Sequence, residues 1–224
     1  MKISFSGKEA YQGEVVTPPG AADGATSPGL VVVQEWWGVN DHMRDVAGRF
    51  AKAGFLVVLP DLYDGKVTKD AGEAGALMQA LDTMRAVDQI RAAALWLKAQ
   101  ASCSGKVGVT GFCMGGAMSF AAACHVPGLS AVVPFYGIPP AEKVDYANVT
   151  APVLAHFARR DEWAAPSKAE AIKAQLDARG APMELCVYDA EHAFFNDTRP
   201  DVHHAESASL AWKRTIAFLH RHLG

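Results

Sequence analysis

Short, continuous apolar segments alternate with helix-like segments along almost the whole chain, and this alternation limits the possible folds more than any other feature. The segments LVVVQ (30–34) and FLVVL (55–59) have no polar residue at alternate positions, as expected for strands buried on both faces. Similar strands are predicted at 106–110, 131–136, 152–157 and 183–188. Because helices separate these strands, right-handed crossovers should place them in parallel. The sequence therefore predicts an α/β fold with a mainly parallel central sheet and helices on both faces.

Residues that commonly cap or end helices mark several helix boundaries. Asn40 and Asp41 precede a helix that Gly54 ends, and Pro166 opens another helix at its first turn. The polar segment 66–75 is predicted to lead into a further helix. Residues expected on buried helix faces are Val87, Ile90, Ala94, Leu95 and Leu97 in one helix and Trp212, Ile216, Leu219 and Leu223 in the last.

The remaining segments add an edge to the sheet but no second domain. Segments 2–5 and 14–17 predict a hairpin at one edge, and segment 18–29, rich in Gly, Pro and Ala, predicts a loop. No change of composition marks a domain boundary. We therefore expect one domain over residues 1–224.

Charge and hydropathy exclude several classes of partner. The chain has 21 basic and 24 acidic residues, a net charge of −3 and no run of Lys or Arg, which argues against nucleic acid as a partner. No apolar stretch approaches the ~20 residues needed to cross a bilayer, and the first eight residues are too polar for a signal peptide. We expect a cytoplasmic protein that is a monomer or a small homo-oligomer and does not bind membranes.

One of the four cysteines has a context that the others lack. The predicted strand 106–110 runs into Gly111-Phe112-Cys113-Met114-Gly115-Gly116, and a helix follows. This is a G-x-C-x-G version of the nucleophile elbow of α/β-hydrolases. The glycines two residues either side of Cys113 allow a sharp, strained turn, and the helix N-terminus favours a thiolate. A lone cysteine is more often a buried structural thiol, but this context favours a nucleophile.

The general base is predicted to be His192. In α/β-hydrolases the acid and then the histidine follow the nucleophile along the chain. His156 lies inside an apolar strand and His204 lies at a helix start, so both have structural explanations. His192 comes just after the last predicted strand, where such sheets place ligands.

The acid is predicted to be Asp161, which lies in the loop 158–162 immediately after the strand 152–157. Two alternatives are weaker. Asp177 falls within a helix, and Asp189 is so close to His192 that it is expected to organise the turn instead. The acid should orient the imidazole and stabilise its protonated form.

The segment after the first buried strand carries a less expected carboxylate. Glu35 precedes Trp36-Trp37-Gly38. An isolated glutamate is usually a solvated loop residue, but this loop supplies part of the oxyanion hole in α/β-hydrolases. Glu35 could therefore contact Cys113 and accept its proton, while the backbone N–H groups of Met114 and Trp36 form the oxyanion hole.

These motifs together resemble the dienelactone hydrolase family. The resemblance is carried by QEWWGVN (34–40), PDLY (60–63), GFCMGG (111–116), FYG (135–137), Asp161 and EHAF (191–194), in the same order and at similar spacing. It implies carboxymethylenebutenolidase-type chemistry, with Cys113, His192 and Asp161 as the triad. It also implies that Glu35 holds or deprotonates the resting thiol, and that neither a metal nor an organic cofactor is needed.

The chain departs from that family where the substrate carboxylate is held. The family has an arginine four residues past the catalytic histidine, where this chain has Asn196. A second family arginine lies in the region that corresponds to the polar segment 66–75, where this chain has Lys69. The residue after the histidine, often serine in the family, is Ala193. Neither asparagine nor alanine can bind a carboxylate through two charge-assisted hydrogen bonds as a guanidinium does. We therefore expect neutral substrates rather than carboxylated ones.

The function predicted from the sequence is hydrolysis of a small lactone or carboxylic ester through a cysteine acyl-enzyme. Trp36 and Tyr136 are expected near the substrate, with Lys69 and Asn196 at the positions where the family binds its carboxylate. Two alternatives stay open: a broad-specificity thiol carboxylesterase, and a non-enzymatic protein that uses Cys113 as a redox-sensing thiol.

Overall fold

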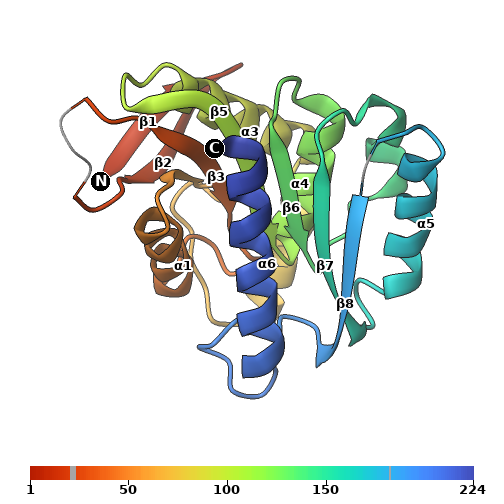
Figure 1. Cartoon of the computed structure of the whole chain (residues 1–224). Helices are drawn as coiled ribbons and strands as arrows, with labels where there is room; N and C mark the ends of the chain where they lie inside the picture. The colour runs from red at the N-terminus through yellow and green to blue at the C-terminus, as the bar shows by residue number, and fades with distance from the viewer. Residues whose placement is uncertain (21–23, 182) are drawn as a thin grey trace.

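The computed structural model describes residues 1–20, 24–181 and 183–224 and contains one eight-stranded sheet (Figure 1). The strand order is β1-β2-β4-β3-β5-β6-β7-β8. Strands β3 to β8 pair in parallel, and β1 and β2 add an antiparallel edge. The strand bounds are β1 Lys2–Ser6, β2 Ala10–Val16, β3 Ser27–Val33, β4 Leu56–Pro60, β5 Cys103–Phe112, β6 Ala131–Phe135, β7 Val153–Arg160 and β8 Met183–Glu191. This arrangement confirms the predicted parallel sheet and its edge hairpin.

Helices cover both faces of the sheet, as predicted. Helices α1 and α6 pack on one face, where α6 crosses in front of the sheet in Figure 1, and α3, α4 and α5 pack on the other. None of the helices within the described residues is long and apolar enough to cross a bilayer. The helix bounds are α1 Asp41–Lys52, α2 Ala71–Ala80, α3 Thr83–Lys98, α4 Met114–His125, α5 Pro166–Asp177 and α6 Ala205–Leu223, with short 3₁₀ turns at Ala141–Lys143 and Tyr146–Asn148.

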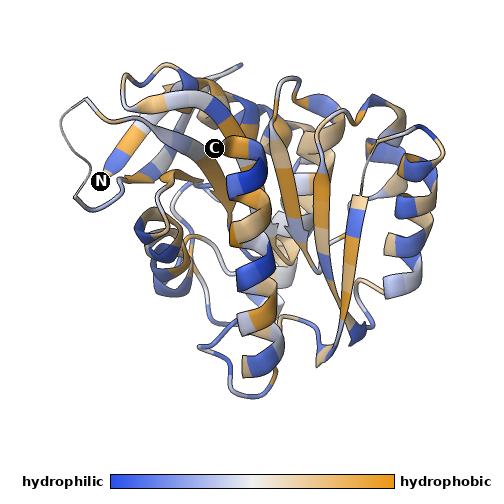
Figure 2. Ribbon diagram, viewed as in Figure 1, coloured by the Kyte–Doolittle hydropathy of each residue, from blue (hydrophilic) through white to orange (hydrophobic). Residues whose placement is uncertain are grey.

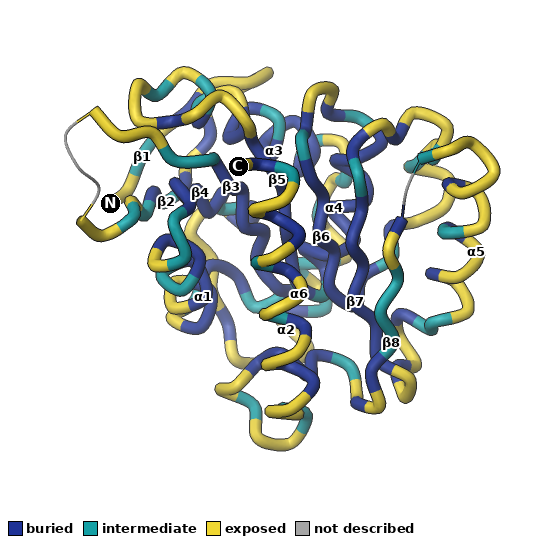
Figure 3. The backbone as a smooth tube through the Cα atoms, viewed as in Figure 1, coloured by how far each residue is buried: buried dark blue, intermediate teal, exposed yellow. Residues whose placement is uncertain are grey.

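The central strands form the core because each is covered on both sides. Every residue from Leu30 to Val33 is fully buried, and so is the segment Val57–Val58 of the neighbouring strand. Figure 2 shows these strands as apolar, and Figure 3 shows them as buried, whereas the outer surfaces of α5 and α6 are polar and exposed. This double burial explains why the strand sequences are continuously apolar.

Several helices begin where their capping residues predict. The Asn40 side chain accepts a hydrogen bond from the backbone N–H of Met43 at 3.0 Å and so caps α1, and Pro166 is the first residue of α5. His204 caps α6 through a bond from the Ser207 backbone, which agrees with its predicted structural role.

Three local predictions are wrong. Leu95 is 57% exposed, because α3 packs on the sheet through Val87, Ile90 and Ala94 instead. The predicted loop 18–29 ends early because Ser27–Val33 extends along β5; its residues 21–23 lie outside the described part of the chain. Asp189 organises no turn, because β8 continues to Glu191 and Asp189 pairs there with Arg160 of β7.

Candidate active site

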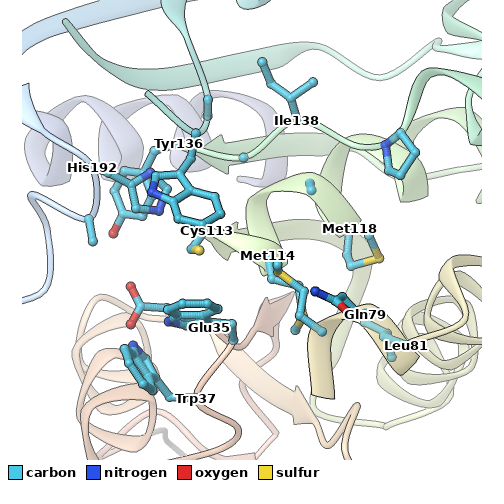
Figure 4. Close-up of a pocket in the computed structure, with 18 of the residues that line it drawn as sticks. Glu35, Trp37, Gln79, Leu81, Cys113, Met114, Met118, Tyr136, Ile138 and His192 are labelled. Atoms are coloured by element: carbon cyan, nitrogen blue, oxygen red, sulfur yellow. The ribbon is translucent and has the colours of Figure 1, made fainter. Parts of the chain in front are cut away.

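The predicted functional residues meet at one edge of the sheet. Glu35 lies two residues after β3, and Cys113, Tyr136, Asp161 and His192 directly follow β5, β6, β7 and β8. These strands are parallel, so their carboxyl ends lie along the same edge, where open α/β sheets bind ligands. Figure 4 shows Cys113 between His192 on one side and Met114 and Met118 on the other.

Cys113 occupies the strained turn that the glycine pattern predicts. Its φ of 55° and ψ of −117° fall in a region that L-residues rarely adopt. A Cβ on Gly111 would lie 2.2 Å from the carbonyl oxygen of Gly115, and one on Gly115 would lie 2.4 Å from that of Val33. Neither position therefore tolerates a side chain while the turn holds this shape.

Two further glycines, which sequence analysis did not single out for this role, support the same turn. A Cβ on Gly116 would lie 2.2 Å from the carbonyl oxygen of Phe135, and one on Gly137 would lie 2.1 Å from that of Cys113. The backbone after β6 thus packs directly against the start of α4. The close approach involves residues far apart in sequence, so spacing alone could not reveal it.

The register of β7 and β8 brings Asp161 and His192 together. Arg160 and Glu191 are partners at the ends of these strands, so the residues that follow them emerge side by side. Asp161 Oδ2 lies 2.7 Å from His192 Nδ1. Asp161 Oδ1 accepts hydrogen bonds from the backbone N–H groups of Trp163 and Ala164, each at 2.8 Å. Asp161 is therefore fixed in position, and it fixes the imidazole in turn.

The electrostatic environment favours a protonated His192. Burial alone would lower the pKa of this imidazole, but hydrogen bonds to Asp161 and Cys113 and the charges of both groups raise the pKa well above its ordinary value. A positively charged imidazole beside Cys113 stabilises a thiolate. The site can therefore hold a nucleophile and an acid–base group next to each other.

The structure also gives the competing residues their own explanations. His156 is completely buried, and its two ring nitrogens contact Tyr188 Oη and Thr215 Oγ1, each at 2.9 Å. Asp177 is exposed at the end of α5. Of the other cysteines, Cys103 and Cys124 are buried and Cys186 is half-buried, and all are free thiols.

Glu35 is buried but bonds to a different residue from the one expected. Its exposed fraction is 1%, and its Oε2 accepts a hydrogen bond from Asn196 Nδ2 at 2.7 Å. The hydrogen bonds among the described residues do not include one between Glu35 and Cys113. Burial raises the pKa of Glu35 to about 7, and the bond from Asn196 offsets this only in part. The role of Glu35 as a proton acceptor for the thiol therefore stays a prediction.

We expect Glu35→Gln to remove the part that Glu35 contributes to the fall in folding stability with rising pH. The carboxyl group ionises near pH 4.5 when unfolded and near pH 7 when folded. The folded state holds the extra proton between these values, so stability from Glu35 is fully present below about pH 4.5 and is lost as the pH rises through about 7. The total loss is about 3 kcal/mol.

Urea unfolding of both proteins at about pH 5 and pH 8 measures this difference. Exposed Glu170 offers the matched control, because its carboxylate is solvated in α5 and Glu170→Gln should leave the fall unchanged. An unchanged pH dependence in Glu35→Gln would show that the buried carboxyl group is not its source.

A cavity of about 630 Å³ opens beside Cys113. Trp36 and Tyr136 line it, as their predicted positions require. Lys69 is exposed and does not line it. Asn196 is 2% exposed, and its amide is engaged with Glu35 and Thr198. Neither Lys69 nor Asn196 is therefore among the residues that line the cavity, and their contact with a substrate stays a prediction.

An arginine that sequence analysis missed lines the cavity. Arg199 lines the cavity, lies over the Trp37 ring at 6.0 Å and pairs with Asp201 at 2.6 Å. It comes seven residues after His192 instead of four, so a fixed-spacing comparison missed it. Trp163 was missed as well: it is 68% exposed at the rim and lies 6.1 Å from the Trp36 ring. Its position two residues after Asp161 is the sequence feature that could have indicated its place at the site.

Within the described residues, no group of three or more His, Cys, Asp or Glu side chains is arranged to hold a metal ion. The chemistry offered by the residues present is that of a thiol, an imidazole and two carboxyl groups. Met114 begins α4, so its N–H is among those that a helix leaves without an intrahelical partner. It is available to a ligand oxygen beside Cys113.

Comparison with known proteins agrees with this fold. The profile of the dienelactone hydrolase family matches residues 12–223. "Protein usf" of Aquifex pyrophilus is 36% identical, covering 88% of this chain and 89% of that protein. "Putative carboxymethylenebutenolidase" of Yersinia pestis is 33% identical, covering 87% of this chain and 78% of that protein.

A solved structure shows the same α/β-hydrolase fold over the full length. It is a dienelactone hydrolase-like promiscuous phosphotriesterase from metagenomic libraries, with a TM-score of 0.89 and 23% identity. The alignment covers 100% of this chain and 98% of that one. With the profile match over nearly the whole chain, these findings show that the protein has the α/β-hydrolase fold and belongs to the dienelactone hydrolase family.

Proposed function

We propose that this protein hydrolyses a lactone or a carboxylic ester through an acyl-enzyme on Cys113. The observation that carries the proposal is the hydrogen bond of 2.7 Å between Asp161 and His192, with the imidazole beside Cys113 at the edge of a cavity. Activation of a nucleophile by an imidazole that a carboxylate orients is the arrangement used for acyl transfer.

In the first half of the reaction, the Cys113 thiolate adds to the substrate carbonyl carbon. The negative charge that develops on the carbonyl oxygen is held by the backbone N–H groups of Met114 and Trp36. The bond from carbon to the leaving oxygen then breaks, and His192 gives its proton to that oxygen. The products are the free alcohol, or the opened end of a lactone, and a thioester on Cys113.

In the second half, water releases the acid. His192, now neutral, takes a proton from water, and the resulting hydroxide attacks the thioester carbonyl. The carbon–sulfur bond breaks, the thiolate returns to Cys113, and the carboxylic acid leaves. Asp161 keeps the same bond to Nδ1 throughout, so Nε2 of His192 carries every proton transfer.

Esters and lactones suit this thiol better than amides do, because an amine is harder to expel from a tetrahedral thiol adduct. A broad-specificity thiol carboxylesterase differs from a lactone hydrolase only in the cavity, so both share this mechanism. A redox-sensing thiol would need no oriented His–Asp pair, and the Asp161–His192 bond therefore favours hydrolysis. We propose small-molecule substrates, no cofactor and a cytoplasmic monomer or small homo-oligomer.

Trapping of the acyl-enzyme tests the proposal. Incubation with p-nitrophenyl acetate followed by acid quenching should add one acetyl group to the intact protein, and peptide mapping should place it on Cys113. Half-buried Cys186 is the matched control, since Cys186→Ala should be labelled like the parent and Cys113→Ala should not. Ester hydrolysis with no acyl group on Cys113 in any trapping condition would refute the mechanism.

A further inference from the structure

The cavity extends away from Cys113 on the side opposite His192. In Figure 4, Met118, Leu81, Gln79 and Ile138 lie on the far side of Cys113 from His192. We call this extension the apolar arm. Its lining residues come from α2, the start of α3, α4 and the segment after β6, and they are Met78, Gln79, Leu81, Thr83, Met118, Ile138 and Pro140.

The two sides of the cavity differ in charge. The residues of the apolar arm carry no ionisable side chain. The charged lining residues are Glu35, His192 and Arg199. Figure 4 shows Glu35 and His192 on the same side of Cys113, and Arg199 lies close enough to Glu35 to lower its pKa. A substrate that fills the cavity therefore meets an uncharged, mainly apolar surface at one end and charged groups at the other.

The chemistry of the proposed reaction, on which this inference rests, determines which part of the substrate faces each side of the cavity. His192 must deliver its proton to the leaving oxygen, so the leaving alcohol lies on the His192 side of Cys113. The acyl chain on the other side of the carbonyl carbon then points toward Met118 and Leu81. We propose that the apolar arm binds an extended apolar acyl chain and that this protein prefers such acyl groups to short ones.

The size of the cavity supports an extended substrate. Its volume of about 630 Å³ falls within the range that encloses a ligand of drug size. An acetyl group would leave the apolar arm unfilled. Burial of each additional methylene group against Met78, Met118 and Ile138 improves transition-state binding by about fourfold until the arm is full.

A series of p-nitrophenyl esters tests this proposal. The value of kcat/KM should rise at least about tenfold from the acetate to the hexanoate. Met118→Trp, which fills the arm from α4, should abolish this gain while changing acetate hydrolysis less than about twofold. Because Met118 is 5% exposed, Leu81→Trp at the half-buried end of α2 provides a second variant that fills the arm with less risk to folding.

Two controls separate the acyl side from the alcohol side. Acetate esters of alcohols of increasing length, measured by acid release, should respond equally in the parent and in both arm variants. Val202→Phe, on a lining residue outside the arm, should leave the gain from acetate to hexanoate in place. The proposal is overturned if the gain is absent in the parent, if the arm variants affect acetate and hexanoate alike, or if they alter the alcohol series instead. Failure to hydrolyse any ester would overturn the proposed function itself.

Discussion

Replacement of Cys113 by alanine is expected to lower kcat/KM for an activated ester by at least about 10⁴-fold. The proposed mechanism passes entirely through the thioester, so no other side chain takes over when the sulfur is absent. The structure around the site should persist, because the 2.7 Å bond between Asp161 and His192 does not involve Cys113. Steady-state kinetics with p-nitrophenyl hexanoate and acetate would measure the loss.

Cys186→Ala is the control for this experiment, since Cys186 is also a half-buried free thiol but lies within β8 away from the cavity lining. Its activity should remain within about twofold of the parent. Circular dichroism should give the same spectrum for both variants. Full activity in Cys113→Ala would remove Cys113 from the mechanism and leave the redox-sensing alternative open.

Asp161→Asn is expected to lower kcat by about 10³- to 10⁴-fold with little change in KM. Oδ1 of Asp161 accepts two backbone N–H bonds, from Trp163 and Ala164. An asparagine must keep its only oxygen there, so its NH₂ group would face His192 Nδ1. The imidazole would then carry its proton on Nε2 and could not accept one from water.

Asp189→Asn is the matched control because Asp189 is also a carboxylate close to His192 in the chain. Its side chain is exposed and pairs with Arg160, so the substitution should change kcat less than about twofold. If Asp189→Asn were the slower enzyme, Asp161 would be the wrong acid. A pH profile of Asp161→Asn should also show that activity does not recover at high pH, as expected for an imidazole held in the wrong tautomer.

The fold was predictable because its strongest signals are local. Strands covered on both faces need continuous apolar sequences, and the segments 30–34 and 55–59 have them. The turn at Cys113 requires glycine on either side for steric reasons that act within a few residues. Asn40 and Pro166 mark helix starts through their own side chains.

Features that depend on long-range packing were not predictable in the same way. The contact between Glu35 and Asn196 joins residues 161 positions apart, and nothing in the sequence around either one indicates the other. Arg199 reaches the cavity through the path of the segment between His192 and α6, which has no periodicity. The pairing of Arg160 with Glu191 sets the position of Asp161 beside His192, but strand register is determined by the whole sheet.

The two walls of the cavity have different origins in the chain. Cys113, Asp161 and His192 extend from the ends of core strands, whereas Met78, Gln79 and Leu81 come from α2 and its end, where Ala74 is the one buried residue of the helix. The proposed apolar arm thus includes a short helix that supplies no residue to the reactive centre, although Met118 of α4 lines the arm as well. A substitution confined to this helix would therefore change the size of the arm while leaving Cys113, Asp161 and His192 at the strand ends in place.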